Sequence, residues 1–139
     1  MFKCIVYATD GSEHARKALA YARDLAKLHE SELYVVHAYP VVSDLLGYRE
    51  YDLVLARRLG QGQEIIDEVE KEFEAAGVPV EVELLEGPMA EAILRVAEAR
   101  KADLIILGAR GRSSLQGLLL GSVSQKVIQH ATCPVLVVR

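Results

Sequence analysis

The chain has 139 residues, of which 51% are hydrophobic and 26% charged, and its formal net charge is −4. This length fits one domain spanning residues 1–139, and the balance is typical of soluble globular proteins. The acidic charge argues against the broad cationic surface that binds nucleic acid or anionic lipid, and no apolar run approaches the ~20 residues that cross a bilayer.

The first residues predict a cytoplasmic protein. The start, MFKCIVYATDG, lacks the long apolar stretch and the small-residue cleavage site of a secretory signal. Cys4 lies in the first apolar run and Cys133 lies just before the last. Their positions predict two isolated buried thiols rather than a disulfide framework or a CxxC pair.

The first half of the chain predicts a strand, a helix, a strand and a second helix. Phe2–Ala8 and Leu33–Ala38 are apolar runs rich in β-branched residues, and helical spacing of apolar residues lies between them. Pro40–Gly62 has no clean period, so we expect a loop and then a helix that begins near Tyr48. Each glycine in a helix interior costs about 1 kcal/mol relative to alanine. Gly60 and Gly62 therefore favour a helix that breaks or starts late.

The second half continues this alternation. The predicted strands are Pro79–Leu85, Asp103–Leu107 and Pro134–Val138, with helical spacing around Ile93 and a helix after Gly121. Strands that alternate with helices imply right-handed crossovers and a parallel sheet covered on both faces. We therefore expect an α/β fold with a doubly wound, five-stranded parallel sheet.

Glycines occur where the fourth predicted strand ends and where the last helix begins. Both places lie on the same edge of a parallel sheet, where bare backbone and helix N-terminal N–H groups can approach a phosphate. Ser122 and Ser124 can add hydroxyl donors, and Arg110 or Arg112 can supply positive charge. The alternative is purely structural: Gly108 ends a strand, Gly111 forms a turn and Ser122 caps a helix.

The spacing Gly108-x2-Gly111-x9-Gly121-Ser122 resembles the nucleotide-binding signature of the ATP-binding universal stress proteins. The resemblance extends along the whole chain, with further matching segments at Ala8–Ser12, Val35–Ala38, Gly87–Pro88, Ala102–Gly108 and Cys133–Val138.

The resemblance implies the strand order 3-2-1-4-5, which places a crevice between the first and fourth strands. It implies that Asp10 contacts the ribose or the metal-phosphate region, where a carboxylate can hold Mg²⁺, and that backbone at Ala38 meets the adenine. The alternative for Asp10 is an acidic residue favoured near a helix start. The implied ligand is ATP, with ADP or AMP left open, and the implied site consists of Ala8, Thr9, Asp10, Ala38, Leu107, Gly108, Arg110, Gly111, Gly121, Ser122, Val123 and Ser124.

Three functions remain open at this stage. The favoured hypothesis is a regulatory protein of the stress response that holds ATP. The second is a slow ATPase or a phosphoryl or nucleotidyl transferase, and the sequence offers no clear residue to orient a nucleophile. The third is a structural dimer module with an empty site, which the intact glycine signature disfavours.

The C-terminal run points to self-association. Pro134–Val138 is an apolar strand that ends at Arg139, and an uncovered edge strand tends to pair with another strand. The resemblance implies antiparallel pairing with the same strand of a second copy, which gives a homodimer. The apolar loop Leu115–Leu120 is expected to fold back over the core, with partner docking as the alternative.

Overall fold

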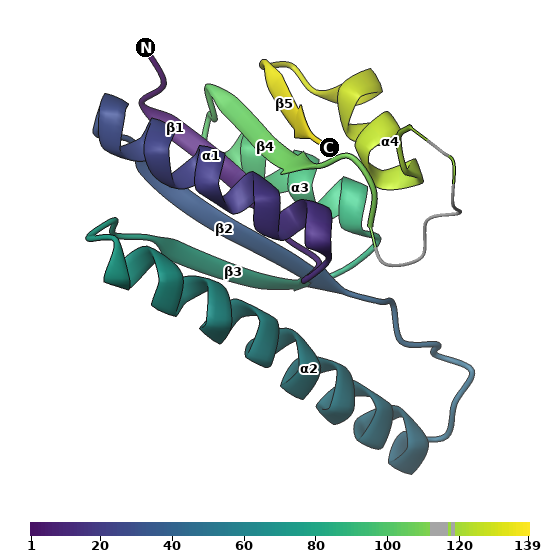
Figure 1. The fold of residues 1–139 in the computed structure, drawn as a ribbon. Coiled ribbons are helices and arrows are strands. Elements are labelled where there is room, and N and C mark those ends of the chain that lie inside the picture. The colour runs from purple at the N-terminus through teal and green to yellow at the C-terminus, as the bar shows by residue number, and fades with distance from the viewer. Residues whose placement is uncertain (112–116, 118) are drawn as a thin grey trace.

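The structure is a computed structural model that describes residues 1–111, 117 and 119–139. Five parallel strands form one sheet in the order β3-β2-β1-β4-β5 (Figure 1). The expected fold class and strand order are therefore confirmed. The strands are β1 (Cys4–Ala8), β2 (Glu32–Tyr39), β3 (Glu81–Glu86), β4 (Leu104–Gly108) and β5 (Val135–Val138).

Four helices connect the strands. They are α1 (Glu13–His29), α2 (Tyr48–Ala75), α3 (Met89–Ala99) and α4 (Ser122–His130). Among the described residues, no helix combines the length and the apolarity that crossing a membrane requires.

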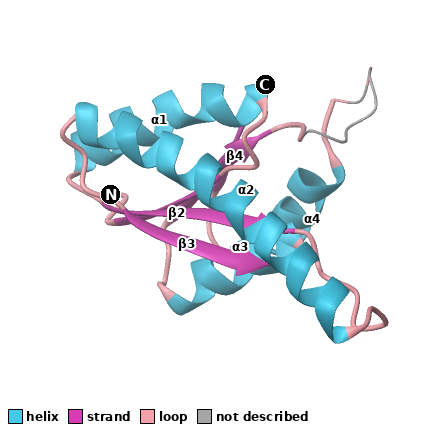
Figure 2. Cartoon of the chain, turned by 90° about the horizontal axis from the view of Figure 1, so that it is seen from below, coloured by secondary structure: helices cyan, strands magenta, loops and turns pink. Residues whose placement is uncertain are grey.

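Successive side chains of the central strand β1 pack in the two cores on opposite faces of the sheet, because side chains alternate along a strand. Ile5 and Tyr7 pack in one core with residues of α1 and α2. Cys4, Val6 and Ala8 pack in the other core with residues of α3 and α4. The sheet is thus covered on both faces (Figure 2), and its strand ends are held at fixed positions by two packed layers.

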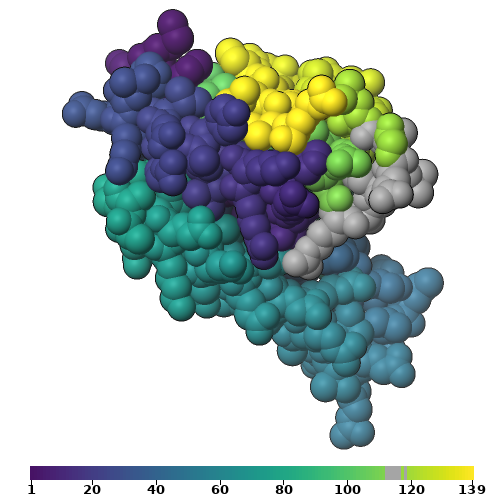
Figure 3. Space-filling model, in the orientation of Figure 1, coloured from purple at the N-terminus to yellow at the C-terminus, as the bar shows by residue number. Residues whose placement is uncertain are grey.

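Helix α2 runs without a break from Tyr48 to Ala75, so the expectation of a break at its glycines was wrong. Gly62 is buried, and a Cβ built on it would lie 2.7 Å from Leu84 Cδ1 and 3.3 Å from His37 Cδ2. The glycine therefore lets the helix pack closely on β2 and β3. The N-terminal turns of α2 project beyond the body of the molecule (Figure 3), and Tyr48 is 94% exposed there.

Both cysteines are free thiols. Cys4 is buried, as expected, whereas Cys133 is only partly buried. Burial raises the pKa of both thiols, which keeps them in the less reactive protonated form.

Candidate functional site

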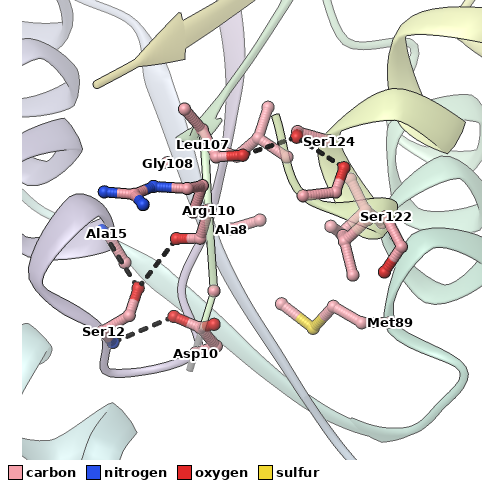
Figure 4. Close-up of a pocket in the computed structure, with 15 residues that line it drawn as sticks. Ala8, Asp10, Ser12, Ala15, Met89, Leu107, Gly108, Arg110, Ser122 and Ser124 are labelled. Carbon is pink, nitrogen blue, oxygen red and sulfur yellow. Dashed lines mark hydrogen bonds between the residues drawn. The ribbon is translucent and has the colours of Figure 1, made fainter. Parts of the chain in front are cut away.

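A pocket opens at the carboxyl edge of the sheet, beside the ends of β1 and β4 (Figure 4). It contains about 510 Å³ of space, counting the part that is open to solvent. All the predicted site residues except Thr9 and Ala38 line this pocket: Ala8, Asp10, Leu107, Gly108, Arg110, Gly111, Gly121, Ser122, Val123 and Ser124. The fold thus brings together segments from both ends of the sequence.

Thr9 and Ala38 lie outside the pocket lining. Thr9 is 1% exposed, its N–H donates to Val36 O at 2.9 Å, and its Oγ1 accepts a hydrogen bond from Gly11 N at 3.1 Å. These bonds make Thr9 part of the turn after β1. Ala38 is buried near the end of β2, opposite Leu85 of β3. The contact of Ala38 with adenine therefore stays a prediction.

Asp10 stands in a tight turn at the start of α1. The turn needs a positive φ of 77° at Gly11, and Asp10 Oδ1 accepts a hydrogen bond from Ser12 N at 2.9 Å. Ser12 is the N-cap of α1, and its Oγ accepts from Ala15 N at 3.3 Å. One carboxylate oxygen of Asp10 thus supports the turn, while the residue as a whole still lines the pocket.

Close packing explains the glycines at the end of β4 and in the loop after it. A Cβ on Gly108 would lie 2.8 Å from both the backbone N of Ala15 and the backbone C of His14. A Cβ on Gly111 would collide with Oδ2 of Asp10. Glycine at these positions lets the loop lie directly against the start of α1, and this packing creates the wall of the pocket that carries Asp10.

The start of α4 presents backbone N–H groups to the pocket. Its N-cap is Gly121, which has no capping side chain, so the structural alternative in which Ser122 caps the helix was wrong. The N–H groups of a first helical turn lack partners within the helix and carry the positive end of its dipole. Ser122, Val123 and Ser124 form that turn and line the pocket, which creates a site suited to an anion.

The two serines of this turn differ in their environment. Ser122 is exposed, whereas Ser124 is 1% exposed. The Oγ of Ser124 lies 2.7 Å from Ala109 O and 3.0 Å from Gly121 O, and it donates to these carbonyls. Ser124 therefore holds the loop to the helix, and the hydroxyl of Ser122 is the one placed to donate to a ligand.

Arg110 lines the pocket with its backbone, but its guanidinium points toward α1 (Figure 4). Its Nη2 lies 3.2 Å from Nε2 of His14. The other expected source of charge, Arg112, lies outside the described residues, as do residues 115, 116 and 118 of the loop Leu115–Leu120.

The opposite wall of the pocket comes from α3, which the sequence did not predict as part of the site. Met89 and Ile93 supply apolar surface there. Lys126 of α4 forms an ion pair with Glu91 of α3 and lowers the pKa of that carboxyl group, so the two helices that flank the pocket are linked.

The sequence signal that could have located this wall is Gly87–Pro88, directly before α3. The other lining residues that were not predicted are Ser12, Ala15 and Ala109.

Acidic side chains are scarce at this site. Asp10 is the only acidic residue that lines the pocket in the part of the chain that the structure describes. Within that same part, no three His, Cys, Asp or Glu side chains are grouped as metal ligands. A metal here would need ligands from a bound molecule as well.

Comparison with known proteins places this chain in a family. The profile of the universal stress protein family matches residues 1–139. The "Universal stress protein in QAH/OAS sulfhydrylase 3'region" of Thermus aquaticus is 47% identical, with all of both chains covered. The structure of protein MJ0577 of Methanocaldococcus jannaschii superposes with a TM-score of 0.86 at 30% identity, covering 99% of this chain and 96% of the other.

A second solved structure carries a ligand. It is a universal stress protein in complex with cAMP, with a TM-score of 0.78 and 28% identity, covering 99% of this chain and 97% of that one. The profile and the Thermus relative both extend over the full length of the sequence. This chain belongs to the universal stress protein family.

Proposed function

We propose that this protein binds ATP in the pocket between β1 and β4 and acts as a nucleotide-dependent regulator in a stress response. The observation that carries the proposal is the start of α4, where an uncapped helix N-terminus and the exposed Ser122 line a pocket together with the Gly108–Gly111 loop. Such a helix start favours phosphate oxygens. The family member with bound cAMP supports an adenine nucleotide as the ligand.

In the proposed arrangement the phosphates lie against the start of α4 and the ribose lies near Asp10. A carboxylate readily accepts hydrogen bonds from ribose hydroxyls. The adenine extends toward Thr9, directly after β1, and Ala38, near the end of β2.

We also propose that Mg²⁺ accompanies the nucleotide. Mg²⁺ is commonly held by one or two carboxylates together with substrate phosphates and water. Asp10, as the single acidic residue of the described lining, fits that use and does not by itself form a metal site. Binding of Mg²⁺ is therefore expected to depend on the nucleotide.

A regulatory protein that responds to nucleotide bound in the pocket is favoured over an enzyme with rapid turnover. The described lining offers backbone N–H groups, hydroxyls and one carboxylate. Groups that bind ATP and its transition state equally well lower the dissociation constant without raising turnover. We therefore propose hydrolysis well below the ~1–10³ s⁻¹ typical of enzymes, with a slow ATPase or transferase as the alternative.

The test begins with the purified protein. It is denatured, any released nucleotide is identified by mass spectrometry, and calorimetry then measures binding of ATP, ADP, AMP and GTP to nucleotide-free protein. We expect adenine nucleotides to bind and GTP to bind more weakly. No binding of any adenine nucleotide would contradict the proposal, and single-turnover hydrolysis of several per second that Asp10→Asn abolishes, while binding persists, would favour the enzyme.

Two further properties are proposed for the assembly and its location. β5 is an edge strand of the sheet, and we propose that it pairs with β5 of a second copy to form a homodimer. The two free thiols fit a reducing compartment, and ATP is the proposed ligand. We therefore propose that the protein acts in the cytoplasm.

A further inference from the structure

The side chain of Arg110 is held away from the phosphate-binding start of α4. Its backbone lines the pocket, while the guanidinium points to α1, where Nη2 lies 3.2 Å from His14 Nε2 (Figure 4). A guanidinium can only donate hydrogen bonds. His14 Nε2 therefore accepts, and the neutral imidazole carries its hydrogen on Nδ1.

Close packing between the end of β4 and the first turn of α1 holds the backbone of His14 beside the loop that carries Arg110. The backbone of His14 approaches so near to Gly108 that an added Cβ would lie 2.8 Å from its carbonyl carbon. The hydroxyl of Ser12 lies 3.5 Å from Arg110 O and adds a long contact between the same segments. The backbone segments that carry His14 and Arg110 are thus packed against each other.

In the contact between Arg110 and His14, one ring nitrogen of His14 has an unmet hydrogen-bonding requirement. Nδ1 of His14 is buried, and none of the described residues forms a hydrogen bond with it. The tautomer that accepts from Arg110 therefore leaves a buried N–H donor without a partner, which is unfavourable. A phosphate offers the guanidinium stronger, charge-assisted and bidentate hydrogen bonds than a neutral imidazole does.

We propose that His14 holds Arg110 in a resting position and that the β- and γ-phosphates of a bound nucleotide draw the guanidinium into the pocket; this inference rests on the proposed nucleotide site. Arg110 then determines the preference for a triphosphate over a monophosphate. His14 is a positioning residue that lowers the affinity for ATP, because a binding-competent state that is only partly populated reduces the apparent affinity in proportion.

The test is a double-mutant cycle in which calorimetry measures ATP and AMP binding. We expect Arg110→Ala to weaken ATP binding about tenfold and to change AMP binding less than about twofold. We expect His14→Ala to strengthen ATP binding about two- to tenfold and to leave AMP binding unchanged. In the double variant the gain from His14→Ala disappears, since no arginine remains to be released.

His14→Gln is the matched control, because its side-chain carbonyl can accept the hydrogen bond from Arg110. We expect its ATP affinity to stay near that of the parent protein. A second readout needs no variant: the NMR shift of the His14 Nε2 nitrogen should change when ATP is added and stay constant with AMP.

Three results of the affinity measurements would overturn the inference while leaving the proposed function intact. They are an unchanged ATP affinity in His14→Ala, a gain that persists in the Arg110→Ala background, or an equal gain for AMP. A chemical shift of His14 Nε2 that stays constant when ATP is added would also overturn the inference. This measurement uses the parent protein, so it holds even if His14→Ala fails to fold. Absence of ATP binding to the parent protein would overturn the proposed function itself.

Discussion

At the scale of single residues, Ser122 and Ser124 lie two positions apart in the first turn of α4 and have different roles. The hydroxyl of Ser122 is exposed at the pocket, whereas that of Ser124 donates to Ala109 O and Gly121 O. We expect Ser122→Ala to weaken ATP binding about 10- to 100-fold, because it removes a hydrogen bond to a charged group. Calorimetry measures the affinity, and thermal unfolding should show an unchanged stability.

Ser124→Ala is the matched comparison within the same turn. We expect it to reduce the free energy of unfolding by about 1–3 kcal/mol, since it removes a buried hydroxyl that links the loop to the helix. Urea unfolding measures this loss. If Ser122→Ala bound ATP as tightly as the parent protein, Ser122 would not contact the phosphates.

The sequence predicted which residues surround the pocket better than it predicted what their side chains do. The spacing of the glycines is visible in the sequence itself. It was therefore possible to predict that Gly108, Gly111 and Gly121 lie at the pocket. The direction of a side chain depends on partners that are distant in sequence. Arg110 contacts His14, 96 positions away, and no local pattern contains that contact.

At the scale of helices and strands, α2 shows how packing overrides helix propensity. Its two glycines, Gly60 and Gly62, have the same helix-propensity cost relative to alanine. Gly60 is exposed, and an added Cβ there meets nothing within 4 Å. At Gly62 the Cβ would lie 2.7 Å from Leu84 Cδ1. Helix propensity alone predicted a broken helix, because it does not include tertiary contacts. In the fold, packing against β2 and β3 stabilises one side of the helix.

The two glycines can be tested as a pair. We expect Gly60→Ala to raise the free energy of unfolding by about 0.5–1 kcal/mol, because it relieves the entropic cost of glycine in an open position. We expect Gly62→Ala to be less stable than Gly60→Ala by about 1–3 kcal/mol, because Leu84 and the ring of His37 must shift. Equal stability of the two variants in urea unfolding would show that α2 does not pack closely at Gly62.

The boundaries of the strands were predictable for a physical reason. The inner strands of a parallel sheet covered on both faces are nearly continuous apolar runs. The edge strand β3, with the sequence EVELLE, is an exception. The observed bounds of all five strands differ from the expected ones by at most two residues. The pocket wall on α3 was not predictable in this way. Met89 and Ile93 are apolar residues of an ordinary helix, and only the sheet order brings them opposite Asp10.

At the scale of the whole molecule, the hydrogen bonds of β5 define which backbone groups are left at the edge of the sheet. Pro134 O accepts from Ile105 N, and Val138 O accepts from Ala109 N. Backbone groups of successive residues point to alternate sides of a strand. The N–H groups of Val135 and Val137 therefore face away from β4, where a second copy could pair with them.

This geometry gives a sharp test of the proposed homodimer. Val137→Pro removes an outward N–H group, a change that an edge strand tolerates, so we expect a folded monomer where the parent protein is a dimer. Val138→Pro is the comparison, because its lost N–H points toward β4 and the expected result is a lower unfolding temperature. Sedimentation measures the assembly and calorimetric melting the stability. A parent protein that sediments as a monomer, or a Val137→Pro variant that remains a dimer, would mean that β5 does not form the interface.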